Sequence, residues 1–260
     1  YYTAHGFHFY KGASKKNWLV FYPIEKYFSK LTDKVITITK EDYCLAKKKF
    51  SCEVERIHGV GVDEQRYFPV DEKVKDDLKD KMGYMSDQKI ILCVGELNKN
   101  KNQIMAIKAM AGIVKENPEA ILLLAGNGPE KENLEEAIEE KNLTGNVKLI
   151  GYVTNLQEYQ HIADIAISCS KREGLPLNVV EAMLSGTPVV ATMNRGHREL
   201  IQDGVDGFTV AVNDEKALKN KIIELLNEKK MYDVISQQAL DNAKQYTFKN
   251  VKRELEKIYF

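Results

Sequence analysis

Short apolar runs recur along the second half of the chain, and segments with helical spacing separate them. Six runs have the length of buried strands, at residues 89–97, 120–128, 147–153, 163–170, 187–192 and 207–212. Helices are expected between them, at about 102–116, 130–141, 155–162 and 176–185. Near-continuous apolar strands that alternate with helices indicate a parallel sheet covered on both faces. The pattern therefore predicts a doubly wound α/β domain over about residues 89–230.

The first part of the chain carries fewer elements of the same kind. Strands are expected at residues 1–9, 34–39 and 54–63, and helices at 15–31 and 40–50. Three strands are too few for a second complete sheet, and the chain opens without Met inside a strand-like run. We interpret this part as a partial, N-terminally truncated Rossmann-like domain. A polar, lysine-rich segment at 71–88 follows and carries no predicted element.

The chain ends in a segment with apolar residues at helical spacing, behind an expected N-cap at Thr247. This helix is expected to pack back on the N-terminal part. The predicted organisation is a partial N-terminal domain over 1–60, a C-terminal domain over 61–245 and a returning helix over 246–260.

Composition and charge narrow the class of protein. The 260 residues include 38 basic and 38 acidic side chains, and this balance gives no general attraction to nucleic acid or to an anionic membrane. The four cysteines lack CxxC spacing, which is typical of reduced thiols in a reducing compartment such as the cytoplasm. No apolar run has transmembrane length, and no signal peptide opens the chain.

The stretch KREGLPLNVVEAMLSGTPVVAT places two glutamates around a predicted helix. Pro176 suits the first turn, so the free N–H groups of Leu177 and Asn178 are expected to form an anion site. Glu181 lies in the second turn and leans toward the same cleft, where a carboxylate can accept hydrogen bonds from two vicinal hydroxyls. Spacing alone supports a structural interpretation equally well, in which Glu181 has a partner within the protein and Glu173 is an ordinary acidic residue of a loop.

The stretch VGELNKNKNQ contains a second candidate set. Gly95 ends a strand, and Lys101 precedes the next helix, where it can meet a diphosphate. On this motif alone, a solvated lysine pair is the simpler interpretation. His5 ends the first strand, where a lone histidine is more often structural than catalytic. AGNGPE lacks the full GxGxxG fingerprint, which disfavours a dehydrogenase, and no metal-binding motif or DxD is present.

Taken in order, these segments resemble glycosyltransferase family 4, retaining enzymes of the GT-B fold with two Rossmann-like domains. REGLPLNVVEAMLSGTPVVAT resembles the E-x7-E signature of the family, VGELNKNK its VGRL-x3-K segment, and LLLAGNGPEKENLE its GDGP segment. VKLIGYV is similar to the strand beside the base, ADIAISCSKREGLP to the approach to the glutamates, and RGHRELIQDGVDGFTV to the segment after them. IHGVGVD resembles the interdomain PNGVD. The resemblance covers residues 54–260 well and 1–53 more loosely.

The resemblance implies a nucleotide-sugar site, with UDP as the expected nucleotide. It implies that Glu173 contacts the donor sugar as a catalytic residue and that His5 lies near the reacting sugar. Glu181 would hold the ribose hydroxyls. The remaining implied nucleotide-sugar contacts are Lys101, Leu177 and Asn178 at the diphosphate, Gly95 at the strand end and the backbone of Val153 at the base. Because cations and a helix N-terminus would stabilise the departing diphosphate, no metal is expected.

The same resemblance implies transfer of a hexose or N-acetylhexosamine to a glycan or lipid-linked acceptor, in bacterial capsule or other surface polysaccharide assembly. Acceptor recognition and a peripheral contact with the inner membrane would belong to the N-terminal domain, and this chain would be mainly the donor-binding part. The alternatives are an epimerase like UDP-N-acetylglucosamine 2-epimerase, which shares the fold, and a non-catalytic subunit of a transferase complex.

Two positions depart from the family pattern. Glu96 stands where the family usually has a phosphate-binding arginine, and Lys99 is the nearest replacement. Arg195-Gly196 stands where the family usually has paired glycines before Glu199. The first departure puts one cation of the expected diphosphate site in doubt.

Overall fold

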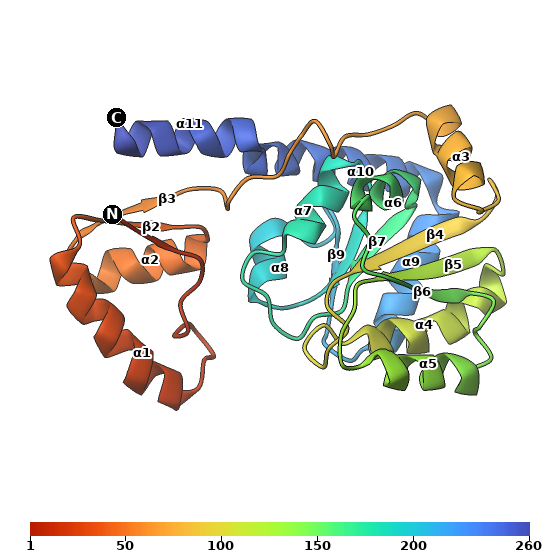
Figure 1. Ribbon diagram of the computed structural model, residues 1–260, viewed down its shortest axis with the longest axis horizontal. Coiled ribbons are helices and arrows are strands. Elements are labelled where there is room, and N and C mark those ends of the chain that lie inside the picture. The colour runs from red at the N-terminus through yellow and green to blue at the C-terminus, as the bar shows by residue number, and fades with distance from the viewer. The chain divides into compact units, whose positions relative to one another are not determined.

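The predicted strands and helices lie in two units in the computed structural model, which describes residues 1–260 (Figure 1). Unit 1 comprises residues 1–62 and 245–260, and unit 2 comprises residues 63–244. Each unit contains its own parallel sheet, with three strands in unit 1 and six in unit 2. The α/β class predicted from the sequence is confirmed.

Unit 2 is built on a sheet with the strand order β6-β5-β4-β7-β8-β9, in which every pair is parallel. The strands are β4 (Lys89–Val94), β5 (Ala120–Ala125), β6 (Val147–Gly151), β7 (Ile165–Ser168), β8 (Val189–Thr192) and β9 (Phe208–Val210). The chain adds strands outward from β4 on one side and then from β7 on the other. The junction of β4 and β7 is therefore a topological switch point, where ligands bind beyond the carboxyl ends of parallel strands.

Helices cover both faces of this sheet, with α4, α5 and α9 on one face and α6, α7 and α10 on the other (Figure 1). The helices of unit 2 are α3 (Glu72–Lys81), α4 (Gln103–Glu116), α5 (Lys131–Glu140), α6 (Leu156–Ile162), α7 (Leu177–Leu184), α8 (Arg195–Leu200), α9 (Glu215–Asn227) and α10 (Lys229–Ala243). Along β4, Ile91 and Cys93 pack in the core with α4, whereas Ile90 and Leu92 pack with the end of α6. This burial of alternate side chains on both faces explains why the strand is apolar throughout.

Helix α3 lies within the polar segment 71–88, for which the sequence predicted no element. The helix begins behind Asp71, whose carboxylate accepts a first-turn backbone N–H at 2.8 Å. Its Lys79 is 2% exposed and lies 3.4 Å from Asp164, which also accepts the N–H of Ile90 at 2.7 Å. The apolar periodicity did not reveal this helix because its most deeply buried contact is ionic. Helices α9 and α10 also had no predicted counterpart.

Unit 1 contains a parallel sheet in the order β1-β2-β3, and its strands are β1 (Tyr2–Ala4), β2 (Lys34–Thr37) and β3 (Glu53–Arg56). Its helices are α1 (Lys15–Phe28), the 3₁₀ turn η1 (Ser29–Leu31), α2 (Lys40–Lys49) and α11 (Phe248–Tyr259), which follows the 3₁₀ turn η2 (Lys244–Tyr246). The first strand is shorter than predicted because the chain turns at Gly6, with φ of 141°. After this turn Phe9 packs against Trp18, with ring centroids 5.5 Å apart.

Helix α11 is bound to the segment that ends the first part of unit 1. Its cap is Thr247, as predicted, and the hydroxyl accepts a first-turn backbone N–H at 3.4 Å. Glu254 of the helix accepts the backbone N–H of His58 at 2.8 Å and lies 2.6 Å from the imidazole Nδ1. The N–H of Phe248 donates to the carbonyl of Val62 at 2.9 Å. No helix of the protein is long and apolar enough to cross a membrane.

Candidate functional site

A cavity of about 340 Å³ opens at the carboxyl ends of β4, β5 and β6 in unit 2. Its lining is Val94, Gly95, Glu96, Ala125, Gly126, Asn127, Tyr152, Val153 and Leu156. The structure thus brings Gly95 and Val153, two predicted site residues, to one cavity. Few polar side chains line it, a composition that suits a flat ring with a small number of hydrogen-bonding groups.

The shape of this cavity depends on the close approach of the ends of β4, β5 and β6. The N–H of Gly95 donates to the carbonyl of Ala125 at 2.9 Å, and the N–H of Gly126 donates to the carbonyl of Gly151 at 2.8 Å. Gly126 has φ of 139°, and a Cβ there would collide with the carbonyl oxygen of Gly95. Only glycine fits this position, which explains the first glycine of the AGNGPE turn.

Lys101 and Glu173 form an ion pair with each other. The sequence analysis assigned them to different parts of one ligand, Lys101 to the diphosphate and Glu173 to the sugar. The Lys101 Nζ lies 2.6 Å from Glu173 Oε1, and the side chains are 23% and 13% exposed. Lys101 also packs beside Gly95, where an added Cβ would come within 3.2 Å of its side chain. The pair therefore lies next to the residue that borders the cavity.

The loops that carry this pair are joined by backbone contacts. The N–H of Lys171 donates to the carbonyl of Asn100 at 2.8 Å, and the Asn100 side chain donates to the carbonyl of Arg172 at 3.0 Å. Gly196, at the start of α8, lies so close to Glu173 that an added Cβ would be 2.6 Å from the Glu173 Cβ. The second glycine of the family pair is therefore required here, whereas the first position tolerates Arg195.

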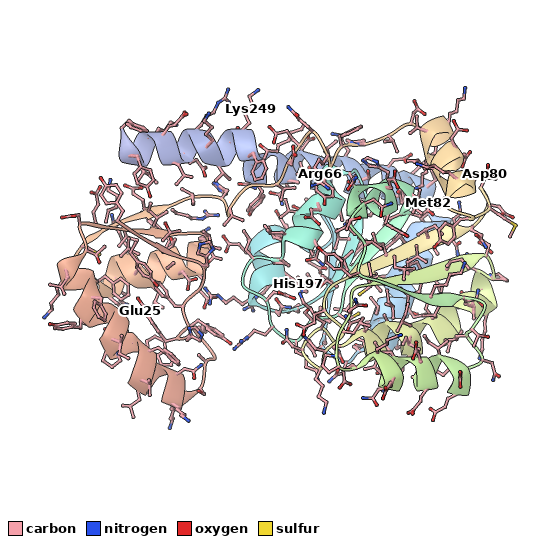
Figure 2. The ribbon with its side chains drawn as sticks, in the orientation of Figure 1. Glu25, Arg66, Asp80, Met82, His197 and Lys249 are labelled. Carbon is pink, nitrogen blue, oxygen red and sulfur yellow. The ribbon has the colours of Figure 1, made fainter.

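A buried polar cluster that was not predicted from the sequence lies at the ends of β7 and β8. At its centre is His197, fully buried, which is labelled in Figure 2. The imidazole Nδ1 lies 2.6 Å from the carbonyl of Thr192, and Nε2 lies 2.9 Å from the hydroxyl of Ser168. The Asn194 side chain donates to the carbonyl of Ser170 at 2.9 Å, three residues before Glu173. Burial lowers the pKa of His197, so the imidazole is neutral at pH 7.

The first residues of α7 are those at which the sequence predicted an anion site. The N–H groups of Val179 and Val180 donate to the carbonyl of Pro176, which precedes the helix, so Leu177 and Asn178 carry the first amides of the helix. The Asn178 side chain donates to the carbonyl of Val94 at 2.9 Å, which ties the helix start to the end of β4. These amides thus lie at the switch point of the sheet.

Glu181 has neighbours that sequence reasoning missed. Burial raises the pKa of Glu181, whereas the nearby Tyr67 side chain and the positive charge of Arg66 act in the opposite direction. The only sequence signal for these neighbours was a basic and an aromatic residue shortly after IHGVGVD.

Lys99 does not take the place of the missing arginine in the cavity that contains Glu96. It lines a separate cavity of about 90 Å³ together with Lys171 and Glu130. The Glu96 carboxylate instead accepts a hydrogen bond from the side chain of Asn98 at 2.9 Å. Lys99 as a replacement for the phosphate-binding arginine stays a prediction.

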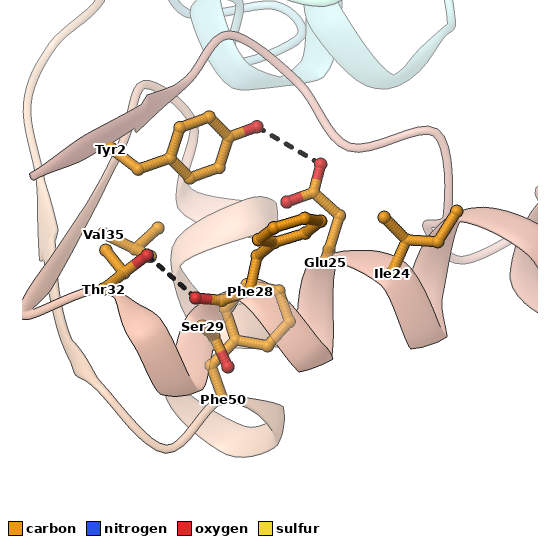
Figure 3. A pocket seen from close by; sticks show the side chains of 8 residues that line it. All are labelled: Tyr2, Ile24, Glu25, Phe28, Ser29, Thr32, Val35 and Phe50. Carbon is orange, nitrogen blue, oxygen red and sulfur yellow. Dashed lines mark hydrogen bonds between the residues drawn. The ribbon is translucent and has the colours of Figure 1, made fainter.

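His5 belongs to unit 1 and is exposed directly after β1. A second pocket of about 330 Å³ lies in the same unit (Figure 3). Its lining is Tyr2, Ile24, Glu25, Phe28, Ser29, Thr32, Val35 and Phe50. The Tyr2 hydroxyl donates to Glu25 at 3.2 Å across it. No residue predicted to bind or react lines this pocket.

The geometry of unit 2 can hold an extended ligand with three chemically different parts. The apolar cavity suits a flat ring, the α7 amides and Lys101 suit an anion, and the carboxylates of Glu173 and Glu181 suit hydroxyl groups. No group of three or more His, Cys, Asp or Glu side chains is placed to share a metal ion.

The fold and the site define a doubly wound α/β protein with a ligand site at the carboxyl edge of its sheet. The chain belongs to the family of group 1 glycosyl transferases, whose family model matches residues 74–241. It is therefore a member of a family of transferase enzymes, as the sequence motifs predicted.

Individual relatives agree with this assignment. The chain is 37% identical to EpsD of Bacillus subtilis (strain 168), named as a glycosyltransferase, over 260 residues that cover 99% of this chain and 68% of EpsD. It is 26% identical over 233 residues to the UDP-Gal:alpha-D-GlcNAc-diphosphoundecaprenol alpha-1,3-galactosyltransferase of Escherichia coli, which covers 87% of this chain and 60% of that protein. These names do not favour the epimerase alternative.

Solved structures show the same fold. The crystal structure of Anabaena HepE in complex with UDP matches with a TM-score of 0.86 and 21% identity, over 99% of this chain and 71% of HepE. The likeness supports the GT-B fold inferred from the motifs.

Proposed function

We propose that the chain is the donor-binding part of a retaining glycosyltransferase that moves a hexose or N-acetylhexosamine from a UDP-sugar to a glycan or lipid-linked acceptor. The observation that carries the proposal is the convergence of an apolar cavity, the Lys101–Glu173 pair and the α7 amides at the switch point of one sheet. The name of the Escherichia coli relative contains UDP-Gal, and HepE was crystallised with UDP, so UDP is the first nucleotide to test.

Each part of the donor would have its own contacts. The base would enter the cavity beside Gly95 and Val153, and the ribose hydroxyls would bind Glu181. Lys101 would turn from Glu173 to the diphosphate, joined there by the amides of α7. This exchange would free Glu173 for the hydroxyls of the donor sugar.

The leaving diphosphate would be stabilised by the protein alone. When the bond between the sugar and the diphosphate breaks, negative charge grows on the departing oxygen. The Lys101 ammonium and the positive end of α7 would stabilise that charge without a metal ion. We propose His5, in unit 1, as a second catalytic residue beside the reacting sugar, on the resemblance of TAHGFHF to the family segment.

The names of the relatives support a proposal for the acceptor. The Escherichia coli relative is named for a diphosphoundecaprenol-linked acceptor, which favours a lipid-linked glycan for this chain as well. We also propose, from the sequence resemblance, that the reaction belongs to surface polysaccharide assembly at the cytoplasmic face of the membrane.

UDP is expected to raise the melting temperature of the chain in the presence of EDTA. A ligand at 100 times its Kd stabilises a protein by about 2.7 kcal/mol, which corresponds to several degrees for a domain of this size. Glu181→Ala should lose most of the shift, and Glu173→Ala should lose less because its proposed contact is with the sugar. Glu136→Ala, which removes an exposed acid from α5, is the matched control.

Differential scanning fluorimetry with UDP, GDP and ADP measures these shifts. A chain that no nucleoside diphosphate stabilises, with or without Mg²⁺, contradicts the donor-site assignment. Stabilisation that depends on Mg²⁺ contradicts only the metal-free part of the proposal.

A further inference from the structure

A polar cavity of about 170 Å³ lies at the amino edge of the sheet in unit 2. Lys89 is the first residue of β4 and Asp164 immediately precedes β7, whereas the proposed donor cavity lies at the carboxyl ends of the strands. Helices α3, α9 and α10 also contribute to the lining, whose charged and hydroxyl-bearing residues are Glu72, Lys75, Lys89, Asp164, Lys229 and Tyr232. This cavity is therefore separate from the donor site and differs from it in chemistry.

Two lysines share the one acid of this cavity that is mostly buried. The Asp164 carboxylate lies 2.8 Å from Lys75 Nζ and 3.4 Å from Lys79 Nζ. It also accepts the backbone N–H of Ile90 at 2.7 Å, so both of its oxygens are in use. The two lysines form no other ion pair, and their side chains are only 12% and 2% exposed. One positive charge is thus left without an acid where water screens it poorly.

Three donors remain available in this cavity. Lys75 Nζ carries three N–H groups and uses two, for Asp164 and for the carbonyl of Ala163 at 3.0 Å. Lys89 forms no ion pair, and the Tyr232 hydroxyl forms no hydrogen bond within the protein. Burial raises the pKa of Tyr232, so the phenol stays protonated at neutral pH. The unused donors thus come from α3, β4 and α10.

We propose that this cavity binds a phosphate group, with Lys75, Lys89 and the Tyr232 hydroxyl as its donors. A tetrahedral anion presents acceptor oxygens in several directions, which suits donors that come from three separate elements. The cavity has about half the volume of the donor cavity, which suits one phosphate group rather than a nucleotide. The bound anion would supply the negative charge that the two lysines on Asp164 lack, and it would join α3, β4 and α10 at the amino edge.

The other charged residues of the lining do not cancel this attraction. Glu72 is exposed in the first turn of α3, where water screens its carboxylate. Lys229 lies 3.4 Å from Asp233 and its side chain is 84% exposed, so we assign it no direct contact with the anion. The charge that a ligand meets inside the cavity is therefore positive.

Titration calorimetry of the full 260-residue chain with inorganic phosphate, at constant ionic strength, tests the proposal. Lys89→Met should weaken binding by roughly tenfold, the usual worth of a hydrogen bond to a charged group, and Tyr232→Phe should weaken it by about threefold. Glu72→Gln should tighten binding, because it removes the opposing charge. Lys115→Met, which removes an exposed lysine of α4, is the matched control and should change nothing.

A phosphate monoester identifies the source of the group. Glucose 1-phosphate that binds more tightly than inorganic phosphate, and loses affinity in Lys89→Met, supports a small phosphorylated molecule as the ligand. Weaker binding of the ester supports free phosphate.

Lys101→Met and UDP separate this cavity from the donor site. Neither the loss of the proposed diphosphate cation nor saturating UDP should change phosphate binding. Phosphate binding that is lost in Lys101→Met, or that UDP displaces, overturns the inference, as does binding that Lys89→Met and Tyr232→Phe leave unchanged. A chain that binds no phosphate overturns it as well, whereas a chain that binds phosphate but no UDP supports it and refutes only the proposed function.

Discussion

At the scale of single residues, the position of Glu173 depends on the cation beside it. The carboxylate is 13% exposed, and its close partner is Lys101, at 2.6 Å. A mostly buried carboxylate needs such a partner, because a charge removed from water without a nearby opposite charge is strongly destabilising. The pair therefore has a structural role without ligand as well as the proposed role in binding.

The pair can be tested by removing one charge and then both. Lys101→Met keeps most of the side-chain volume but leaves Glu173 without its cation, so the free energy of unfolding should fall by about 1–2 kcal/mol. Glu173→Gln added to Lys101→Met should recover most of this loss, because no buried charge remains. Urea denaturation at pH 7 measures both effects, and an equal loss in the single and double variants would contradict them.

At the scale of elements, the ends of β7 and β8 and the start of α8 form one polar layer beneath the Glu173 loop. His197 lies at the centre of this layer. Its Nδ1 is 2.6 Å from the carbonyl oxygen of Thr192, and its Nε2 is 2.9 Å from the hydroxyl oxygen of Ser168. A loop with this many buried polar groups stays in one conformation only if each group is paired. His197 therefore helps to hold the loop that carries a proposed catalytic residue.

The stability of the chain should fall as the pH drops below about 6.5. Burial lowers the pKa of His197 from its ordinary value of 6.5, so below that pH the unfolded chain binds more protons than the folded one. His161 contributes with the same sign, because burial lowers its pKa too, whereas the raised pKa of Glu181 contributes with the opposite sign.

An NMR titration of the histidine side chains tests this directly. The His197 signal, assigned by its loss in His197→Gln, should remain that of neutral imidazole below pH 6.5. A signal that titrates at pH 6.5, as in a free peptide, would show that the buried cluster does not hold the imidazole neutral.

At the scale of the whole molecule, the two units differ in the size of their cores. Unit 2 has a six-stranded sheet with apolar cores on both faces. Unit 1 has three strands, and its helix α1 contains no buried residue and leaves Leu19 79% exposed. The proposed donor contacts other than His5 all lie in unit 2.

The single tryptophan, Trp18, lies in unit 1 and therefore reports on that unit alone. UDP should shift the unfolding transition seen by far-UV circular dichroism to higher urea, because most helices belong to unit 2. The transition seen by Trp18 fluorescence should stay in place. Coincident transitions that both shift with UDP would show that the two units unfold together.

Sequence reasoning was most successful where one local pattern decided the outcome. The strand cores of β4 to β9, helices α4 to α7 and the cap at Thr247 were predicted because apolar periodicity and capping are local properties. The ordered motifs also identified the family, and the structure brought Gly95 and Val153 to one cavity and Lys101 to Glu173.

Only the tertiary structure decided which side chains meet. Lys101 and Glu173 are far apart in the sequence, as are Lys79 and Asp164, and no periodicity relates them. Helix α3 was missed for the same reason, because its buried lysine is matched by an acid on another element. Local spacing determines which elements form, whereas pairing of buried polar groups depends on how those elements pack, and much of this site consists of such pairs.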